Sequence, residues 1–132
     1  MRIRDFNATD FYYPRRIFQL LFYQISHGEM IIRSQKNDNE KDDNTNHTID
    51  IYFGDVIYME IPKKLNGIVF RSALADDVKY INSKIGKKVT EDEIVVIISE
   101  EREYYIVASV ISIIENELSL FELPIHCFMH DV

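Results

Sequence analysis

The chain has 132 residues, of which 46% are hydrophobic and 28% are charged, proportions typical of a soluble globular domain. Its one cysteine, Cys127, has no second cysteine with which to form an internal disulfide. No stretch approaches the roughly 18 apolar residues that a membrane-spanning helix needs, and residues 1–6 lack the apolar region of a signal peptide. We therefore expect a single cytoplasmic domain over residues 1–132 that does not associate with membranes.

The net charge of −7 is concentrated near the C-terminus. Residues 1–36 hold six basic and three acidic side chains, whereas residues 89–132 hold one basic side chain, Arg102, and ten acidic ones. An acidic chain repels phosphate backbones, so direct binding of nucleic acid is disfavoured. The acidic clusters are either solvated turn residues that protect apolar strands from wrong pairing, or parts of one face that receives a basic partner.

The first apolar run, residues 17–25, is followed by a turn signal at residues 26–29 and a second short run at residues 30–33. This order favours a β-hairpin over a helix. Pro14 then marks the entry to the first strand, because proline is disfavoured inside strands. Residues 36–48 contain no apolar side chain, so they predict a mobile polar surface loop within the domain.

From residue 49 the apolar residues alternate with polar ones through residue 61, which predicts one long strand. Gly54 and Asp55 interrupt the pattern without changing its parity, so we expect a bulge there. Residues 65–67 then predict a turn, and residues 68–71 a short strand.

A helix is predicted over residues 73–85. Ser72 is a suitable N-cap, and Gly86 suits the position just after the last turn. Four apolar side chains recur at the spacing of one helix face, and they are Leu74, Val78, Ile81 and Ile85.

The strongest strand signals are residues 94–98 and 104–111, which predict an antiparallel hairpin with a polar loop of about four residues. Both runs are apolar on both parities, so we expect the hairpin to be covered on both faces. One helix covers only one of them. The N-terminal segment, curling of the sheet or a second subunit would cover the other. Residues 118–121 predict a final strand.

No pattern of catalytic residues stands out in the sequence. It lacks a Gly-x-Ser-x-Gly elbow, a glycine-rich phosphate loop and a His-Glu-x-x-His motif. His126, Cys127 and His130 lie close together, but a structural zinc site needs four ligands and no second cysteine exists. We therefore predict a protein that is not an enzyme and that holds no metal and no cofactor.

These elements predict an α+β domain: a curved antiparallel sheet of about five or six strands with one main helix packed on one face. In its size, its richness in Ile, Asn and Lys, its lack of a catalytic motif and its C-terminal acidic clusters, the chain resembles the small acidic immunity proteins that bacteria make against secreted toxins. That resemblance implies a protein that occludes a basic toxin domain, such as a nuclease. A phage-type inhibitor that mimics DNA, and a homo-oligomeric binding or structural domain, are the alternatives.

The occluding surface is predicted to consist of acidic residues near three turns, together with one aromatic residue that adds contact area. A homodimer is also compatible with the sequence. The predicted partner-binding residues are Glu91, Asp92, Glu93, Glu100, Glu101, Glu103, Tyr104, Glu115 and Glu117.

Overall fold

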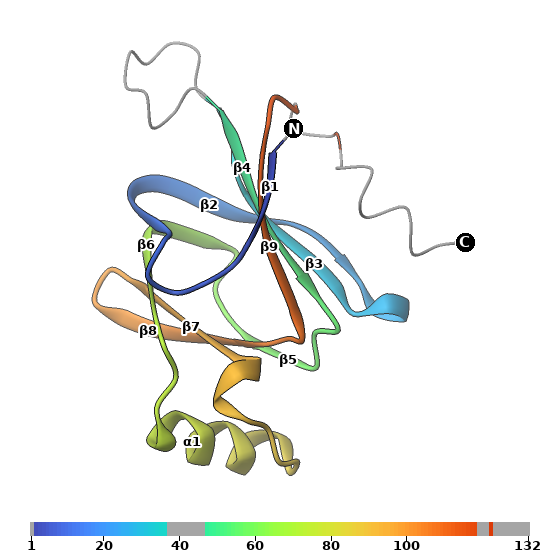
Figure 1. Cartoon of the computed structure of the whole chain (residues 1–132), viewed down its shortest axis with the longest axis vertical. Coiled ribbons are helices and arrows are strands. Elements are labelled where there is room, and N and C mark those ends of the chain that lie inside the picture. Colours follow the sequence, from blue (N-terminus) through green and yellow to red (C-terminus); the bar gives the residue numbers. More distant parts are fainter. Residues whose placement is uncertain (1, 37–46, 119–121, 123–132) are drawn as a thin grey trace.

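The computed structural model describes residues 2–36, 47–118 and 122 (Figure 1). Within them, nine strands form one antiparallel sheet in the order β1-β9-β4-β3-β2-β6-β7-β8-β5, and there is one α-helix. The elements are β1 (Arg2–Asp5), β2 (Tyr12–Gln24), η1 (Ile25–His27), β3 (Glu29–Ser34), β4 (Thr48–Gly54), β5 (Tyr58–Glu60), β6 (Lys64–Arg71), α1 (Ala75–Ile85), η3 (Glu91–Glu93), β7 (Ile94–Ser99), β8 (Arg102–Val107) and β9 (Val110–Asn116).

The α+β arrangement is confirmed, but the size and shape of the sheet were predicted wrongly. The sheet has nine strands instead of five or six, and it is not one curved surface. Strands from both ends of the sheet order contribute to one buried cluster, for example Ile51 of β4, Ile113 of β9 and Ile97 of β7. Two parts of the sheet therefore pack against each other, joined through the neighbouring strands β2 and β6.

Strand β7 is buried on both faces, as its uniform apolar composition predicts, whereas the half of β8 next to the turn is exposed or half-buried. Val95 and Ile97 face the cluster shared with the other part of the sheet. Ile94 and Val96 face the opposite side, where Ile81 of α1 packs against them. The second apolar face is thus covered by the rest of the sheet, and no second subunit is needed for it.

Helix α1 begins two residues later than predicted, which changes its cap and its buried stripe. Leu74 occupies the N-cap position and is 62% exposed, so it does not belong to the stripe, whereas Ile81 is fully buried. The Asp77 carboxylate, not Ser72, accepts a hydrogen bond at the helix start, from the Leu74 N–H at 2.8 Å. Gly86 does end the helix, with φ of 65° and its N–H bonded to the Asn82 carbonyl.

Three strand boundaries differ from the prediction, each at a turn-forming residue. Pro14 lies inside β2, where the pairing with β6 shifts register, so the strand accommodates it at an irregularity. The long strand over residues 49–61 divides into β4 and β5, because Asp55 adopts a left-handed backbone (φ 56°) and redirects the chain. Gly67 lies inside β6 with φ of 72°, where a turn was expected.

The predicted strand over residues 104–111 is likewise two strands, β8 and β9, which lie far apart in the sheet order. The chain leaves β8 at Ala108 and Ser109, whose N–H groups bond to the carbonyls of Glu93 and Gly54, respectively. Residues 37–46 of the predicted polar loop and residues 119–121 of the predicted final strand lie outside the described residues.

Candidate partner-binding surface

The β7–β8 turn consists of two glutamates in an unusual backbone conformation. Ser99 pairs with Arg102, so Glu100 and Glu101 alone form the turn, where a loop of about four residues was predicted. Their φ angles are 51° and 65°, the positive values that a type I′ turn requires at both central positions. Asn and Gly normally occupy these positions, because a left-handed backbone costs other residues about 1–2 kcal/mol each.

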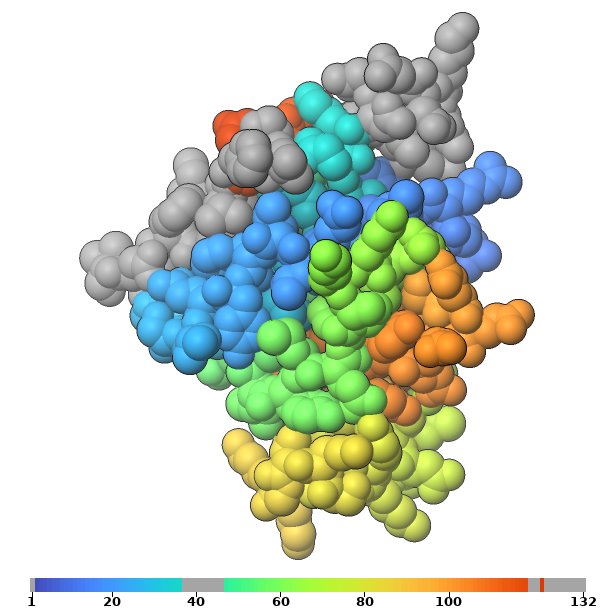
Figure 2. Space-filling view, turned by 180° about the vertical axis from the view of Figure 1, so that it is seen from behind, coloured from blue at the N-terminus to red at the C-terminus, as the bar shows by residue number. Residues whose placement is uncertain are grey.

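This turn is held in place from one side and exposed on the other. The Asn66 side-chain amide of β6 donates a 2.6 Å hydrogen bond to Glu100, and the Ser99 hydroxyl donates to the Asn66 carbonyl at 3.3 Å. Figure 2 shows the hairpin residues, in orange, projecting from one side of the molecule. Within the described residues, neither Glu100 nor Glu101 forms an ion pair, so their negative charges are not neutralised locally.

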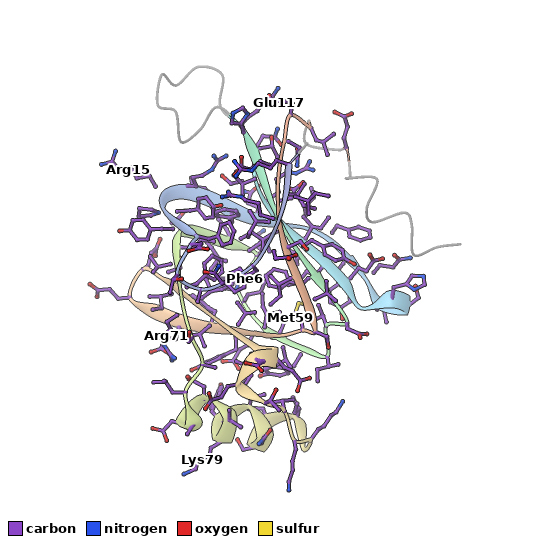
Figure 3. The ribbon with its side chains drawn as sticks, in the orientation of Figure 1. Phe6, Arg15, Met59, Arg71, Lys79 and Glu117 are labelled. Atoms are coloured by element: carbon purple, nitrogen blue, oxygen red, sulfur yellow. The ribbon has the colours of Figure 1, made fainter. Side chains whose placement is uncertain are left out.

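Glu103, two residues beyond the turn, has a structural partner instead. It forms an ion pair with Arg71, whose guanidinium also binds both carboxylate oxygens of Asp77 at 2.7 and 2.9 Å. The Tyr105 hydroxyl donates to the same Asp77 carboxylate at 3.1 Å. Figure 3 places Arg71 beside α1, so this group of side chains ties the helix to the sheet.

The same contacts shift two pKa values. Hydrogen bonding to Arg71 lowers the pKa of Asp77 from 3.8 to about 2. Burial, together with the hydrogen bond to Asp77, raises the pKa of Tyr105 to about 12. Asp77 is therefore ionised and Tyr105 is neutral across the physiological range, which fits a structural contact rather than proton transfer.

A second hydrogen-bonded carboxylate, that of Glu60, lies in an open groove on the β5 side of β8. Glu60 accepts hydrogen bonds from the Tyr58 hydroxyl at 2.7 Å and from the Tyr80 hydroxyl of α1 at 2.7 and 2.8 Å. The bond to Glu60 raises the pKa of Tyr58 to about 12. No described cation forms an ion pair with Glu60. The groove has a volume of about 580 Å³ and is lined by Met59, Glu60, Ile61, Arg102, Glu103 and Tyr104.

The remaining predicted acidic residues lie elsewhere. Glu91–Glu93 form η3 before the first residue of β7, so the six residues of that strand separate them from the turn by about 20 Å. Glu93 accepts a hydrogen bond from the Thr90 N–H at 3.1 Å and caps its own helical turn. Asp92 lies against the segment around Phe6, where it lines a separate open groove with Asp5.

Glu115 lies in β9 and Glu117 just after its end, in the other part of the molecule, and both have basic partners. Glu115 forms an ion pair with Arg4 of β1. Glu117 pairs with Lys36 at 3.2 Å and with His47, and its contact with His47 is the main reason that its pKa is lowered. Figure 3 shows Glu117 at the end of the molecule opposite α1. The acidic clusters are therefore not brought onto one face.

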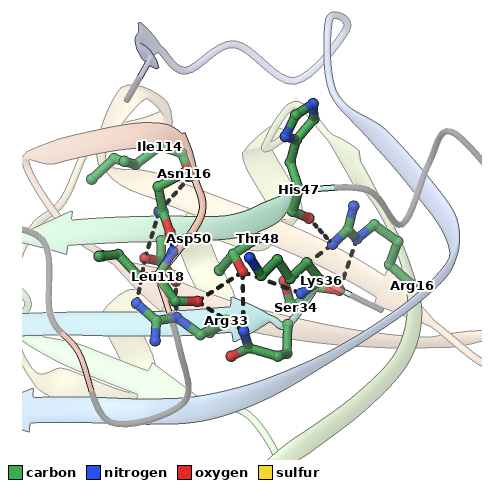
Figure 4. A network of polar contacts seen from close by, with 11 residues as sticks. Arg16, Arg33, Ser34, Lys36, His47, Thr48, Asp50, Ile114, Asn116 and Leu118 are labelled. Carbon is green, nitrogen blue, oxygen red and sulfur yellow. Dashed lines mark hydrogen bonds and ion pairs between the residues drawn. The ribbon is translucent and has the colours of Figure 1, made fainter. Parts of the chain in front are cut away.

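The sequence reasoning missed a buried polar network between β3, β4 and β9 (Figure 4). Arg33 donates to both oxygens of Asp50, at 2.6 and 2.8 Å, and the Asn116 amide donates to Asp50 at 3.0 Å. Both charged side chains are almost completely buried. The sequence indicated this network only by placing the basic Arg33 and the acidic Asp50 in successive predicted strands. The Asp50 carboxylate is fully engaged, so the network links three strands rather than offering a reactive group.

His126, Cys127 and His130 lie outside the described residues. In the described part of the chain, no helix has the length and apolar character to cross a membrane. No family model, no curated protein and no solved structure matches this chain.

Proposed function

We propose that this chain is a non-catalytic inhibitor of the immunity-protein type, which binds and occludes a basic domain of another protein in the bacterial cytoplasm. Its main contact is the β7–β8 turn. The observation that carries this proposal is the pair Glu100–Glu101, two exposed, locally unneutralised carboxylates on a turn whose backbone disfavours glutamate. Such strain at an exposed site is a physical reason to look for function there.

The electrostatics of the turn suit a basic cleft. The short turn fixes the backbone of both residues, and Asn66 holds the Glu100 carboxylate, so little loop ordering opposes binding. Complementary charge accelerates association and is screened by salt. A toxin nuclease, whose cleft binds phosphates, offers the matching positive surface.

Of the nine predicted residues, the proposal keeps Glu100 and Glu101 as the principal contacts, with Tyr104 in the adjoining groove. Glu103 has a smaller role, because its ion pair with Arg71 already neutralises it. The other five acidic residues lie apart from the turn and are not part of the proposed contact.

The test is affinity purification from the native host with three baits: the wild type and two variants that each lack two negative charges. The baits are the wild-type chain, the turn variant E100N/E101G, which places the preferred Asn-Gly in the turn, and the control variant E91Q/D92N. The control also removes two negative charges, but they lie at the opposite end of β7. A basic protein should elute with wild type and with the control at high salt, and should be absent from the turn variant.

A partner retained equally by E100N/E101G would contradict the proposal, because the turn would then make no contribution. So would a partner that stays bound at high salt, since binding would not depend on charge. The purified partner is then assayed for nuclease activity with increasing amounts of the chain, and inhibition that needs Glu100 and Glu101 is the expected result.

A further inference from the structure

Strand β8 has an open backbone edge next to the acidic turn. On one side β8 pairs with β7 along its whole length, from Arg102 to Val107. On the other side its pairing with β5 covers only residues 105–107 and ends where Glu60 lies opposite Tyr105. Within the described part of the chain, residues 102–104 therefore have no strand on that side. An edge of this kind is a template for pairing with another chain.

The alternation of the backbone identifies the groups that point toward this edge. The Val107 carbonyl accepts a hydrogen bond from the Ile57 N–H at 3.0 Å, so the polar backbone groups of Val107 face the β5 side. Alternate residues of an antiparallel strand direct their N–H and C=O groups to the same side. The N–H and C=O of Glu103 therefore point into the open groove.

The walls of the groove have different chemistry on its two faces. Met59, Ile61 and Tyr104 pack against the main core cluster, so they form an apolar wall on the inner face of the sheet. Glu60 lies opposite Tyr105, which belongs to the outer cluster beneath α1, so its carboxylate is on the outer face. An added strand places alternate side chains on these two faces.

We propose that the open edge of β8 at residues 102–104 receives an extended segment of the basic partner as an added β-strand. Apolar side chains of that segment pack on Met59, Ile61 and Tyr104, and the intervening basic side chains meet Glu60. The partner segment therefore alternates apolar and basic residues. Charge complementarity selects this occupant, because Glu60 and the nearby Glu100 and Glu101 lack described ion pairs, whereas the one basic residue of the groove is Arg102. The inference rests on the proposed function for the identity of the partner.

The test is a titration of the full isotope-labelled chain with a synthetic peptide, followed by amide NMR. The probe is the capped hexapeptide KVKVKV, and the control is KKKVVV, which has the same composition and charge without the alternation. We expect KVKVKV to shift the amide signals of residues 102–104 and to slow hydrogen exchange of the Glu103 N–H about ten-fold, because backbone pairing occupies that donor. The control peptide should do neither.

Two variants test the recognition chemistry. Glu60→Gln removes the charge and keeps one oxygen that can still accept from the Tyr58 and Tyr80 hydroxyls, and it should weaken binding of KVKVKV about three- to five-fold. Glu91→Gln, outside the groove, should leave it unchanged. Equal binding of the two peptides, or a Glu103 N–H that is not protected, would overturn strand addition. These outcomes are distinct from failure of the proposed function, which is shown by a partner that E100N/E101G still captures.

Discussion

The backbone of Glu101 provides a quantitative test of the strained turn. Its φ of 65° costs a residue with a Cβ about 1–2 kcal/mol, whereas glycine adopts this conformation freely. Glycine also raises the entropy of the unfolded chain, which opposes the gain by about 0.5–1 kcal/mol. Glu101→Gly should therefore stabilise the protein by about 0.5–1 kcal/mol, because its exposed side chain makes no described contact that would be lost.

The measurement is urea unfolding followed by circular dichroism. With a slope of about 1–3 kcal/mol/M, the midpoint should rise by about 0.2–1 M and the slope should stay unchanged. Glu101→Ala is the matched control, because it removes the same charge but keeps a Cβ at positive φ, and its stability should stay within about 0.5 kcal/mol of wild type. If the alanine variant gained as much as the glycine variant, relief of charge repulsion rather than of strain would explain the effect. No gain for glycine would refute the strain argument itself.

Two further predictions concern the ion pair of Asp77 in α1 and the glycine inside β6. The pKa of Asp77 is lowered from 3.8 to about 2, so its ion pair stabilises the fold above about pH 4 and is lost as the pH falls toward 2. Asp77→Asn should lower the free energy of unfolding at pH 7 by about 1–2 kcal/mol. The variant should also lose less stability than wild type as the pH falls from about 4 to 2, and an equal loss would contradict the argument. Gly67→Ala would place a Cβ 2.3 Å from the Pro14 carbonyl oxygen at a positive φ, and should cost about 2–5 kcal/mol in urea unfolding. Gly86 also has a positive φ but has open space around it, so Gly86→Ala should cost only about 1–2 kcal/mol. If the two alanine variants lost equal stability, the contact with Pro14 would not be decisive.

Much of the secondary structure could be predicted from local patterns, because those patterns report burial on one or two faces. The end of α1 at Gly86 and the two-sided burial of β7 follow directly from sequence. The strand breaks at Asp55 and Ala108 could not be predicted in this way, since the apolar pattern on either side of each break is continuous. An apolar pattern indicates that a residue is buried, but it does not specify which neighbouring strand buries it.

At the candidate site, too, local features could be predicted from the sequence and tertiary features could not. The acidic turn could be located from its flanking apolar runs, but its length and its positive φ values could not, because Glu-Glu is not a type I′ turn sequence. The groove depends on where β5 stops pairing with β8. The end of β5 at Glu60 lies one residue from the predicted end of that strand, but its pairing with β8 rather than with another strand is a tertiary property that the local pattern does not specify.

The pairing of β1 with β9 also bears on how the chain folds during synthesis. Arg2 lies opposite Glu115, and β9 is also the neighbour of β4, so the first part of the sheet depends on nearly the last strand to be made. A ribosome adds about 5–20 residues each second, so for several seconds β1 and β4 each have an edge whose partner, β9, has not yet been synthesised. Contacts this distant in sequence also slow folding of the finished chain. Charged residues on β1, Arg2, Arg4 and Asp5, are then well placed to keep that waiting strand from pairing with other chains.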